Sequence, residues 1–241
     1  MITVILNGYK RPQFLQEQVD AVNNQTVKPT EIMLWQNNDE GFNKELTSKL
    51  TTSVSNTNLG VWARFAYALN AKTEYICVLD DDTIPGDMWF ENCLNTMKTH
   101  EGLLGTVGLI YKNPNDYFPN TRYGWADINN ETVMRVDIVG HAWFFKREWL
   151  SAFWRELPPP NLTIVGEDMH FSYSIQKYLG LNTYVPPHPK NDKRLWGSTK
   201  GWEMGREKHG LSLQGSNLHL MDEYHKILKE KGFKTINDGK I

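Results

Sequence analysis

The sequence has little cysteine, no long apolar run and no excess of either charge. Its 241 residues include only two cysteines, Cys77 and Cys93, which are too few for a disulfide framework and suit buried free thiols. No apolar run approaches the roughly 20 residues that a membrane-spanning helix needs. The chain opens on a strand pattern, with no basic and apolar leader before it. We therefore expect a soluble, cytoplasmic protein without a membrane span.

The near balance of charge excludes one large class of partners. Lys and Arg number 26 against 28 Asp and Glu, a formal net charge of -2. A dedicated nucleic-acid binder draws its affinity mainly from a basic surface, so we expect no nucleic-acid partner. Hydrophobic residues make up 40% of the chain, which is ordinary for a globular protein. Since no linker or repeat interrupts it, we expect a single domain over residues 1–241.

Strand and helix patterns alternate through residues 1–100. Strand patterns occupy 2–6, 31–35 and 75–79, and each is followed by helical spacing of apolar residues, after Pro12, Gly60 and Pro85. Such alternation predicts an α/β fold with right-handed crossovers and a mainly parallel central sheet flanked by helices. Ligands of these sheets bind beyond the carboxyl ends of the strands.

Residues 101–241 are less regular. We expect strands at 103–111 and 133–139, a polar, aromatic loop at 113–132, and helices at 147–154, 167–179 and 217–231. In the polar loop, Tyr117, Tyr123 and Trp125 offer aromatic faces that suit sugar rings. Residues 190–214 are rich in Gly, Lys and Trp with little periodicity, and so long a segment is usually functional or mobile.

The strongest single motif is an acidic triplet that ends an apolar strand, Val78-Leu79-Asp80-Asp81-Asp82. Strand alternation would place Asp80 and Asp82 on one side, with Asp81 opposite. Two carboxylates this close at the edge of a sheet repel each other, unless one takes a proton or a cation lies between them. Mg²⁺ and Mn²⁺ prefer such oxygen ligands. A solvated acidic turn is the alternative interpretation.

Several short motifs precede the triplet in order. The first strand leads into Asn7-Gly8-Tyr9-Lys10-Arg11-Pro12, and the second leads into Asn37-Asn38-Asp39; Asn58-Leu59-Gly60 and Arg64 follow. The ordered set, spread over residues 1–190, resembles the GT-A glycosyltransferases, especially the family-2-like group. Asp80-Asp81-Asp82 falls where that family has its DxD motif. The Gln-x-x-Arg-Trp motif of processive members is absent, which favours the addition of one sugar.

The resemblance implies a GT-A-like domain that transfers one sugar from a nucleotide-diphosphate sugar, with UDP expected, to a hydroxyl acceptor such as a glycan. Residues 1–100 would bind the nucleotide sugar and 101–241 the acceptor, with 190–214 as a mobile loop over the donor. Asp82, helped by Asp80, would hold Mn²⁺ or Mg²⁺ on the diphosphate. The implied donor contacts are Asn7, Arg11, Asn38, Asp39, Asn58, Arg64, Asp80 and Asp81.

A second acidic pair, Glu167-Asp168, opens a predicted helix. Carboxylates in a first helical turn are also ordinary partners of the helix dipole, so the sequence alone leaves both interpretations open. The family carries a similar pair at this place. The resemblance therefore implies that Asp168 is the general base of an inverting transfer, with Glu167 as the fallback.

Two histidines could contribute to the site. His188 lies in Pro186-Pro187-His188-Pro189, and a late histidine is an additional metal ligand in many GT-A members; the alternative is a surface histidine. His141 could contact the donor sugar or the acceptor, or it could be a packed core histidine.

Two other functions stay open at this stage. One is a sugar-nucleotide pyrophosphorylase, although the first strand is not followed by the glycine-rich loop that holds a triphosphate. The other is a carbohydrate-binding module without catalysis, in which the acidic triplet would bind Ca²⁺.

Overall fold

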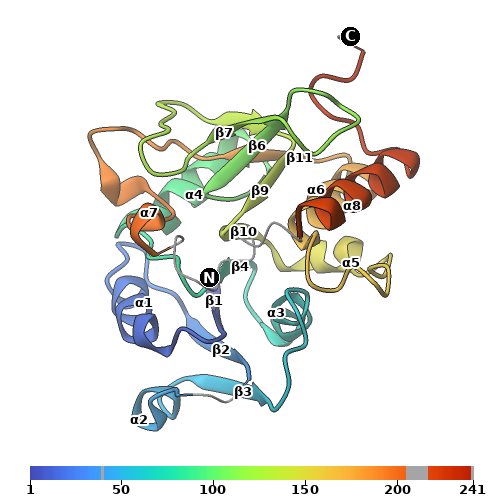
Figure 1. Ribbon diagram of the computed structural model, residues 1–241. Helices are drawn as coiled ribbons and strands as arrows, with labels where there is room; N and C mark the ends of the chain where they lie inside the picture. The colour runs from blue at the N-terminus through green and yellow to red at the C-terminus, as the bar shows by residue number, and fades with distance from the viewer. Residues whose placement is uncertain (39–40, 205–216, 240–241) are drawn as a thin grey trace.

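A computed structural model describes residues 1–38, 41–204 and 217–239, and shows two β-sheets flanked by helices (Figure 1). The larger sheet has eight strands in the order β3-β2-β1-β4-β10-β5-β11-β8. In that order the strands are Thr51–Ser55, Glu31–Asn37, Ile2–Gly8, Tyr75–Leu79, Ala142–Lys146, Gly102–Leu104, Asn182–Val185 and Met134–Val136. The smaller sheet joins β7, β6 and β9, which are Asn120–Tyr123, Val107–Tyr111 and Ile138–Gly140.

The longer helices follow the predicted pattern in both halves of the chain. The α-helices α1 to α8 are Leu15–Asn23, Lys44–Thr47, Ala63–Tyr67, Trp89–Thr99, Leu150–Phe153, Glu167–Leu179, Gly201–Met204 and Leu218–Glu230. In the described part of the chain, the 3₁₀ turns η1 to η4 are Pro12–Phe14, Ala68–Asn70, Arg147–Trp149 and Lys193–Leu195. The predicted helix at 147–154 is thus one 3₁₀ turn followed by a single α-helical turn.

The first half of the large sheet is parallel, as the alternation predicted. β3, β2, β1 and β4 pair in parallel, so their carboxyl ends meet at one edge. That edge collects the polar residues that follow each strand, including Asn7, Asn37 and Asp80. The mixed α/β sheet confirms the predicted fold class.

Beyond β4 the sheet becomes mixed. β10 runs antiparallel to β4, with Ala142 opposite Leu79. An antiparallel neighbour begins where its partner ends. His141, just before β10, therefore lies beside the end of β4, and its carbonyl accepts from the Asp80 amide at 3.0 Å.

Two predicted strands are each divided between the two sheets. Residues 103–111 contain β5 of the large sheet and β6 of the small one, and 133–139 contain β8 and β9 in the same way. Asp137 lies at the second change of sheet and is buried; its carboxylate accepts from the amides of Tyr111 (2.8 Å) and Ile236 (2.7 Å). The sequence predicted one strand in each case, because the residues are apolar throughout and nothing in the pattern marks where the chain passes from one sheet to the other.

The segment predicted as a mobile loop, 190–214, is described only up to residue 204. This part contains η4 and α7 and is hydrogen-bonded to the residues after the acidic triplet. The Gly86 amide donates to the Trp196 carbonyl (2.8 Å), and the Thr199 amide donates to the Ile84 carbonyl (2.8 Å). Residues 205–214 lie outside the described residues, so the prediction of a loop over the donor remains a prediction.

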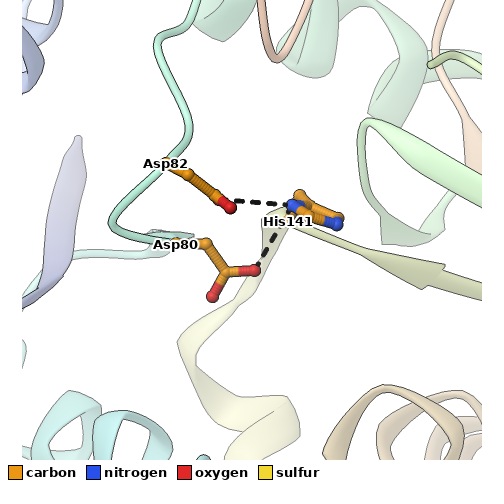
Figure 2. Close-up of side chains that lie close together, drawn as sticks. All are labelled: Asp80, Asp82 and His141. Atoms are coloured by element: carbon orange, nitrogen blue, oxygen red, sulfur yellow. Dashed lines mark ion pairs between the residues drawn. The ribbon is translucent and has the colours of Figure 1, made fainter. Parts of the chain in front are cut away.

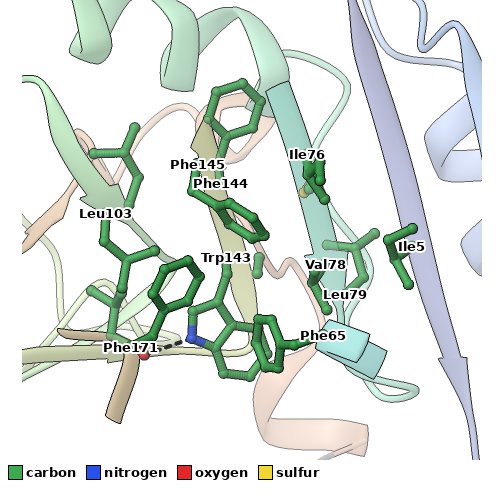
Figure 3. Close-up of a cluster of buried hydrophobic side chains, with 14 of the residues drawn as sticks. Ile5, Phe65, Ile76, Val78, Leu79, Leu103, Trp143, Phe144, Phe145 and Phe171 are labelled. Carbon is green, nitrogen blue, oxygen red and sulfur yellow. Dashed lines mark hydrogen bonds between the residues drawn. The ribbon is translucent and has the colours of Figure 1, made fainter. Parts of the chain in front are cut away.

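The core between the large sheet and its helices is unusually aromatic. Phe65 of α3 packs against Trp143 of β10, with ring centroids 5.4 Å apart, and against Phe171 of α6 at 5.7 Å (Figure 3). Cys77 and Cys93 are buried free thiols, as predicted. Among the described residues, no helix combines the length and the apolar character needed to cross a membrane.

Candidate active site

A pocket of about 510 Å³ opens at the carboxyl edge of the parallel strands. It gathers most of the residues that the sequence singled out: Asn7, Arg11, Asn58, Arg64, Asp80, Asp81, Asp82, Glu167 and Asp168. Tyr117 and Trp125 of the predicted polar loop also line it, whereas Tyr123, the third aromatic residue singled out there, is not in the lining. The structure therefore brings together residues from five separate parts of the chain.

The acidic triplet forms a turn and does not continue the strand. The Thr83 amide donates to the Asp80 carbonyl (3.1 Å), and buried Gln18 of α1 donates to the carbonyls of Asp80 and Thr83. Because of this turn, Asp81 and Asp82 both reach one guanidinium nitrogen of Arg11, at 2.9 and 2.8 Å. The alternation expected for a strand does not apply here.

A second buried arginine links the triplet to helix α6. Arg64 is 4% exposed, and its two terminal nitrogens donate to Asp80 and to Glu167. Its guanidinium lies over the Trp143 ring, 4.6 Å from the centroid. The two ion pairs of Arg64 fix the distance between the end of β4 and the start of α6, because a planar guanidinium holds two carboxylates in a set geometry.

The pocket holds more carboxylates than cations. Asp80, Asp81, Asp82, Glu167 and Asp168 line it together with Arg11, Arg64 and Arg122, so five negative charges meet three positive ones when all are ionised, an excess of two. Burial raises the pKa of Asp81 to about 7 and, together with neighbouring carboxylates, outweighs the attraction of Arg11. Burial likewise raises the pKa of Glu167 and Asp168. The site is thus suited to take up a proton or a cation.

Asp80, Asp82 and His141 form the group that could hold a metal ion (Figure 2). Their ligand atoms all lie within 4.8 Å of one another, and His141 Nδ1 is 3.5 Å from Asp80 Oδ2 and 3.6 Å from Asp82 Oδ1. Asp82 Oδ1 and His141 Nδ1 are buried and accept or donate no hydrogen bond within the described part of the chain. Unpaired buried atoms aimed at each other fit an oxygen-and-nitrogen site for Mn²⁺ or Mg²⁺.

A proton on His141 is the other way to satisfy these atoms. Burial alone would lower the pKa of His141, but Asp82 and Asp80 outweigh it and raise that pKa. For Asp82 the order is reversed: burial would raise its pKa, and His141 with Arg11 lowers it. Asp82 is therefore an ionised carboxylate, ready for either partner.

Helix α6 begins with the second acidic pair. Gly166 precedes it with a φ of +89°, and a Cβ there would lie 2.2 Å from Tyr224 Cδ1. Only glycine fits this close, left-handed approach. Glu167 is paired with Arg64, while Asp168 Oδ1 accepts from the amide of Met169 (2.7 Å). The two neighbours thus differ: one is held by a cation and the other is not.

The predicted third metal ligand, His188, lies elsewhere. It is 2% exposed, stacks on Trp196 at 4.0 Å, and its Nε2 donates to the Ala126 carbonyl (3.0 Å). The histidine beside Asp80 and Asp82 is instead His141. His141 is not a packed core histidine, the alternative that the sequence left open. It lines the pocket beside Trp125, with ring centroids 4.7 Å apart.

The second strand contributes a different asparagine from the one expected. Asn37 lines the pocket; it donates to Asn58 Oδ1 (2.8 Å) and accepts from the Leu59 amide (2.7 Å). Asn38 is absent from the lining, and Asp39 lies outside the described residues. Strand alternation could have identified Asn37, because it is the last residue of β2 and points to the same face as Trp35, two residues earlier.

Sequence reasoning also missed Tyr9 and the apolar side of the pocket. Tyr9 follows β1 and was quoted only as part of a motif. Val107, Leu109 and Ile138 come from β6 and β9 of the small sheet, and Met221 comes from α8. No sequence signal marked these residues, because they look like ordinary strand and helix residues until the two sheets are placed side by side.

The comparison of sequence families settles the class. The profile described as glycosyl transferase family 2 matches residues 3–154. The chain belongs to glycosyl transferase family 2. This confirms the resemblance to GT-A glycosyltransferases and disfavours both the pyrophosphorylase and the carbohydrate-binding module. A search among curated protein sequences finds no match.

Solved structures of S. aureus TarS share the fold of this family 2 domain. TarS 1-349 aligns over 77% of this chain and 60% of that chain, with a TM-score of 0.55 and 15% identity. Its complex with UDP gives 0.56 and 16% over 78% of this chain and 58% of that one. The complex with UDP-GlcNAc gives 0.52 and 15% over 80% and 60%. The chain thus spans about 60% of the TarS 1-349 chain.

Proposed function

We propose that this domain transfers one sugar from a nucleotide-diphosphate sugar, with UDP as the nucleotide, to a hydroxyl acceptor, with inversion at the anomeric carbon. One observation carries the proposal. Buried polar atoms face the pocket without hydrogen-bond partners in the described chain: Asp82 Oδ1, His141 Nδ1, and Nε and Nη2 of Arg11. The oxygen of Asp82 and the nitrogen of His141 can bind a metal ion, and the nitrogens of Arg11 can donate to phosphate oxygens. Together they suit a metal-bound diphosphate.

The metal ligands in this proposal are Asp80, Asp82 and His141, with Mn²⁺ or Mg²⁺ as the ion. When bound, such an ion neutralises charge on the leaving diphosphate. Arg11 keeps Asp82 ionised and oriented, and its two unpaired nitrogens are available to phosphate oxygens. Asn7, Asn37 and Asn58, at the ends of the parallel strands and the following loop, supply polar contacts for the nucleoside.

Asp168 is the general base in this proposal. The acceptor oxygen forms a bond to the anomeric carbon, its proton passes to Asp168, and the diphosphate leaves with the electron pair of the broken bond. Glu167 is held by Arg64, so it serves to position α6 and not to accept the proton. The raised pKa of Asp168 suits this task, because a base works best when its pKa approaches the working pH.

The solved structures support the choice of nucleotide. The TarS structures that share this fold include complexes with UDP and with UDP-GlcNAc. Carrying the nucleotide over to this chain is part of the proposal.

A donor screen tests it. Each of several UDP- and GDP-sugars is incubated with the protein and Mn²⁺ without an acceptor, and release of the nucleoside diphosphate is measured. We expect slow hydrolysis of at least one UDP-sugar and none with EDTA. No hydrolysis and no binding of any nucleotide sugar would overturn the proposal. Product formed from UTP and a sugar 1-phosphate would favour the pyrophosphorylase, and Ca²⁺-dependent binding of free sugars would favour the binding module.

A further inference from the structure

The small sheet turns a defined row of side chains toward the pocket. Arg122 of β7 lies opposite Leu109 of β6, and Leu109 lies opposite Ile138 of β9. Directly opposite residues of antiparallel strands point to the same face. All three line the pocket, with Val107 two residues along β6. The wall across from the parallel strands is therefore an aliphatic stripe that ends in a cation.

The C-terminal helix and the 113–132 segment complete this wall. Met221 of α8 lines the pocket, and the next residue, Asp222, accepts from the Tyr117 amide at 3.1 Å. The Tyr117 ring packs against Tyr111, with centroids 5.7 Å apart. In Figure 1, α8 lies beside α6, the helix whose first turn carries Asp168.

Arg122 differs from the other two arginines in the pocket. Arg11 and Arg64 are buried and bound to carboxylates. Arg122 is exposed at the rim and forms no ion pair or hydrogen bond through its side chain with any residue in 1–38, 41–204 or 217–239. Its positive charge lowers the pKa of the nearby Tyr117 hydroxyl, against the stronger effect of burial, which raises that pKa. A cation that the protein leaves unpaired at a binding site suits an anionic group of a ligand.

We propose that the acceptor is an amphipathic anion: a hydroxyl compound whose apolar body lies on Val107, Leu109 and Met221 and whose carboxylate or phosphate pairs with Arg122. This rests on the proposed transferase function and names its acceptor class. Aliphatic side chains contribute through apolar contact and offer no partner to the hydroxyls of a glycan. One strand spacing, about 5 Å, separates Leu109 from Arg122, so an eight-carbon chain reaches past Leu109 while its anionic end pairs with Arg122.

Four probes separate the two features. 8-Hydroxyoctanoate and 8-hydroxyoctyl phosphate are apolar and anionic, octane-1,8-diol is apolar and neutral, and gluconate is polar and anionic. Each is titrated calorimetrically into the protein with UDP and Mn²⁺ present. We expect one or both apolar anions to bind at least about ten-fold more tightly than the diol and gluconate, since a charge-assisted hydrogen bond contributes about that factor. The stronger of the two distinguishes a carboxylate from a phosphate.

Equal affinity for the diol, equal or tighter binding of gluconate, or no binding by any apolar probe would each overturn the proposal. UDP binding with Mn²⁺ is measured first in the same cell. Its failure would contradict the donor site of the proposed function, and the probes are then titrated into the free protein, where the same order of affinities decides this proposal separately.

Three variants assign the effect to residues. Arg122→Gln should reduce the affinity ratio of apolar anion to diol about ten-fold, toward one. Met221→Gln keeps the side-chain length and should reduce the ratio of apolar anion to gluconate. Arg135→Gln removes an exposed arginine of β8 outside the pocket and should change neither ratio. An unchanged anion-to-diol ratio in Arg122→Gln would overturn the assignment of the cation.

Discussion

The two sides of the pocket are built on opposite principles. On the donor side, polar residues follow the carboxyl ends of parallel strands, and buried arginines hold the acidic triplet through Asp81, Asp82 and Asp80. On the proposed acceptor side, a small antiparallel sheet offers aliphatic side chains and one cation, Arg122, that pairs with none of the described residues. Under the two proposals, the first side binds a donor whose diphosphate charge is constant, whereas the second side selects an acceptor by its shape and by one charge.

The largest effect is expected from a substitution that removes donor binding alone. Asp82→Asn removes the charge of the ionised carboxylate that pairs with Arg11 and faces His141. Because second-layer changes already cost 10–100-fold in metal affinity, we expect loss of a direct ligand to weaken Mn²⁺-dependent UDP binding by more than about 100-fold and to abolish turnover. Calorimetry with UDP and Mn²⁺ measures it.

Asp87→Asn is the matched control, since it removes an exposed carboxylate five residues away that forms no hydrogen bond through its side chain in the described chain. It should bind UDP as the native protein does. UDP binding that survives within a few-fold in Asp82→Asn would contradict the metal site.

The next effect lies where the two sides meet. Asp168→Asn should lower transfer about 10²–10⁴-fold, the usual contribution of a general base, and leave the UDP dissociation constant nearly unchanged. Glu167→Gln, whose amide oxygen can still accept from Arg64, should cost less. Turnover at saturating donor and UDP affinity are measured separately. A collapse of UDP affinity in Asp168→Asn would move this residue to the donor side.

The pH dependence of turnover sharpens the same assignment. Burial raises the pKa of Asp168 above that of a free aspartate, about 3.9. Because the base acts only when ionised, turnover should fall as the pH decreases, and this fall should begin well above pH 4. The limb is measured as kcat against pH at saturating substrates. A flat profile from pH 7 to 4.5 would contradict the role of Asp168.

The smallest effect concerns the scaffold of the second half. Burial lowers the pKa of His170 and of His188 to about 4. Each unfolded histidine takes a proton near pH 6.5, so the folded state binds fewer protons between pH 6.5 and 4, and stability falls as the pH falls through this window. Between pH 7 and 5 each should cost on the order of 2 kcal/mol.

Urea unfolding at the two pH values measures this loss. His170→Gln cannot titrate, so its loss between pH 7 and 5 should be smaller than that of the native protein by one histidine's share. An equal loss in both proteins would show that His170 is not the group responsible.

The residues at the ends of the parallel strands could be predicted from the sequence, whereas those of the small sheet could not. Asp80, Arg11 and Asn58 stand out because βα alternation fixes where strand ends gather, and short polar motifs mark those ends. Leu109, Ile138 and Met221 carry no such mark, because their role depends on two strand patterns being divided between sheets. His141 was the difficult case: its place beside Asp80 follows only from β10 running antiparallel to β4, which periodicity does not reveal.

The most direct measurement is anomalous diffraction at the manganese edge from crystals grown with UDP and Mn²⁺. We expect one manganese peak bound to Asp82 and Asp80 and to Nδ1 of His141, with the UDP phosphates completing its ligands. A manganese ion bound at His188, or ordered UDP in the pocket with no manganese between these carboxylates, would contradict it.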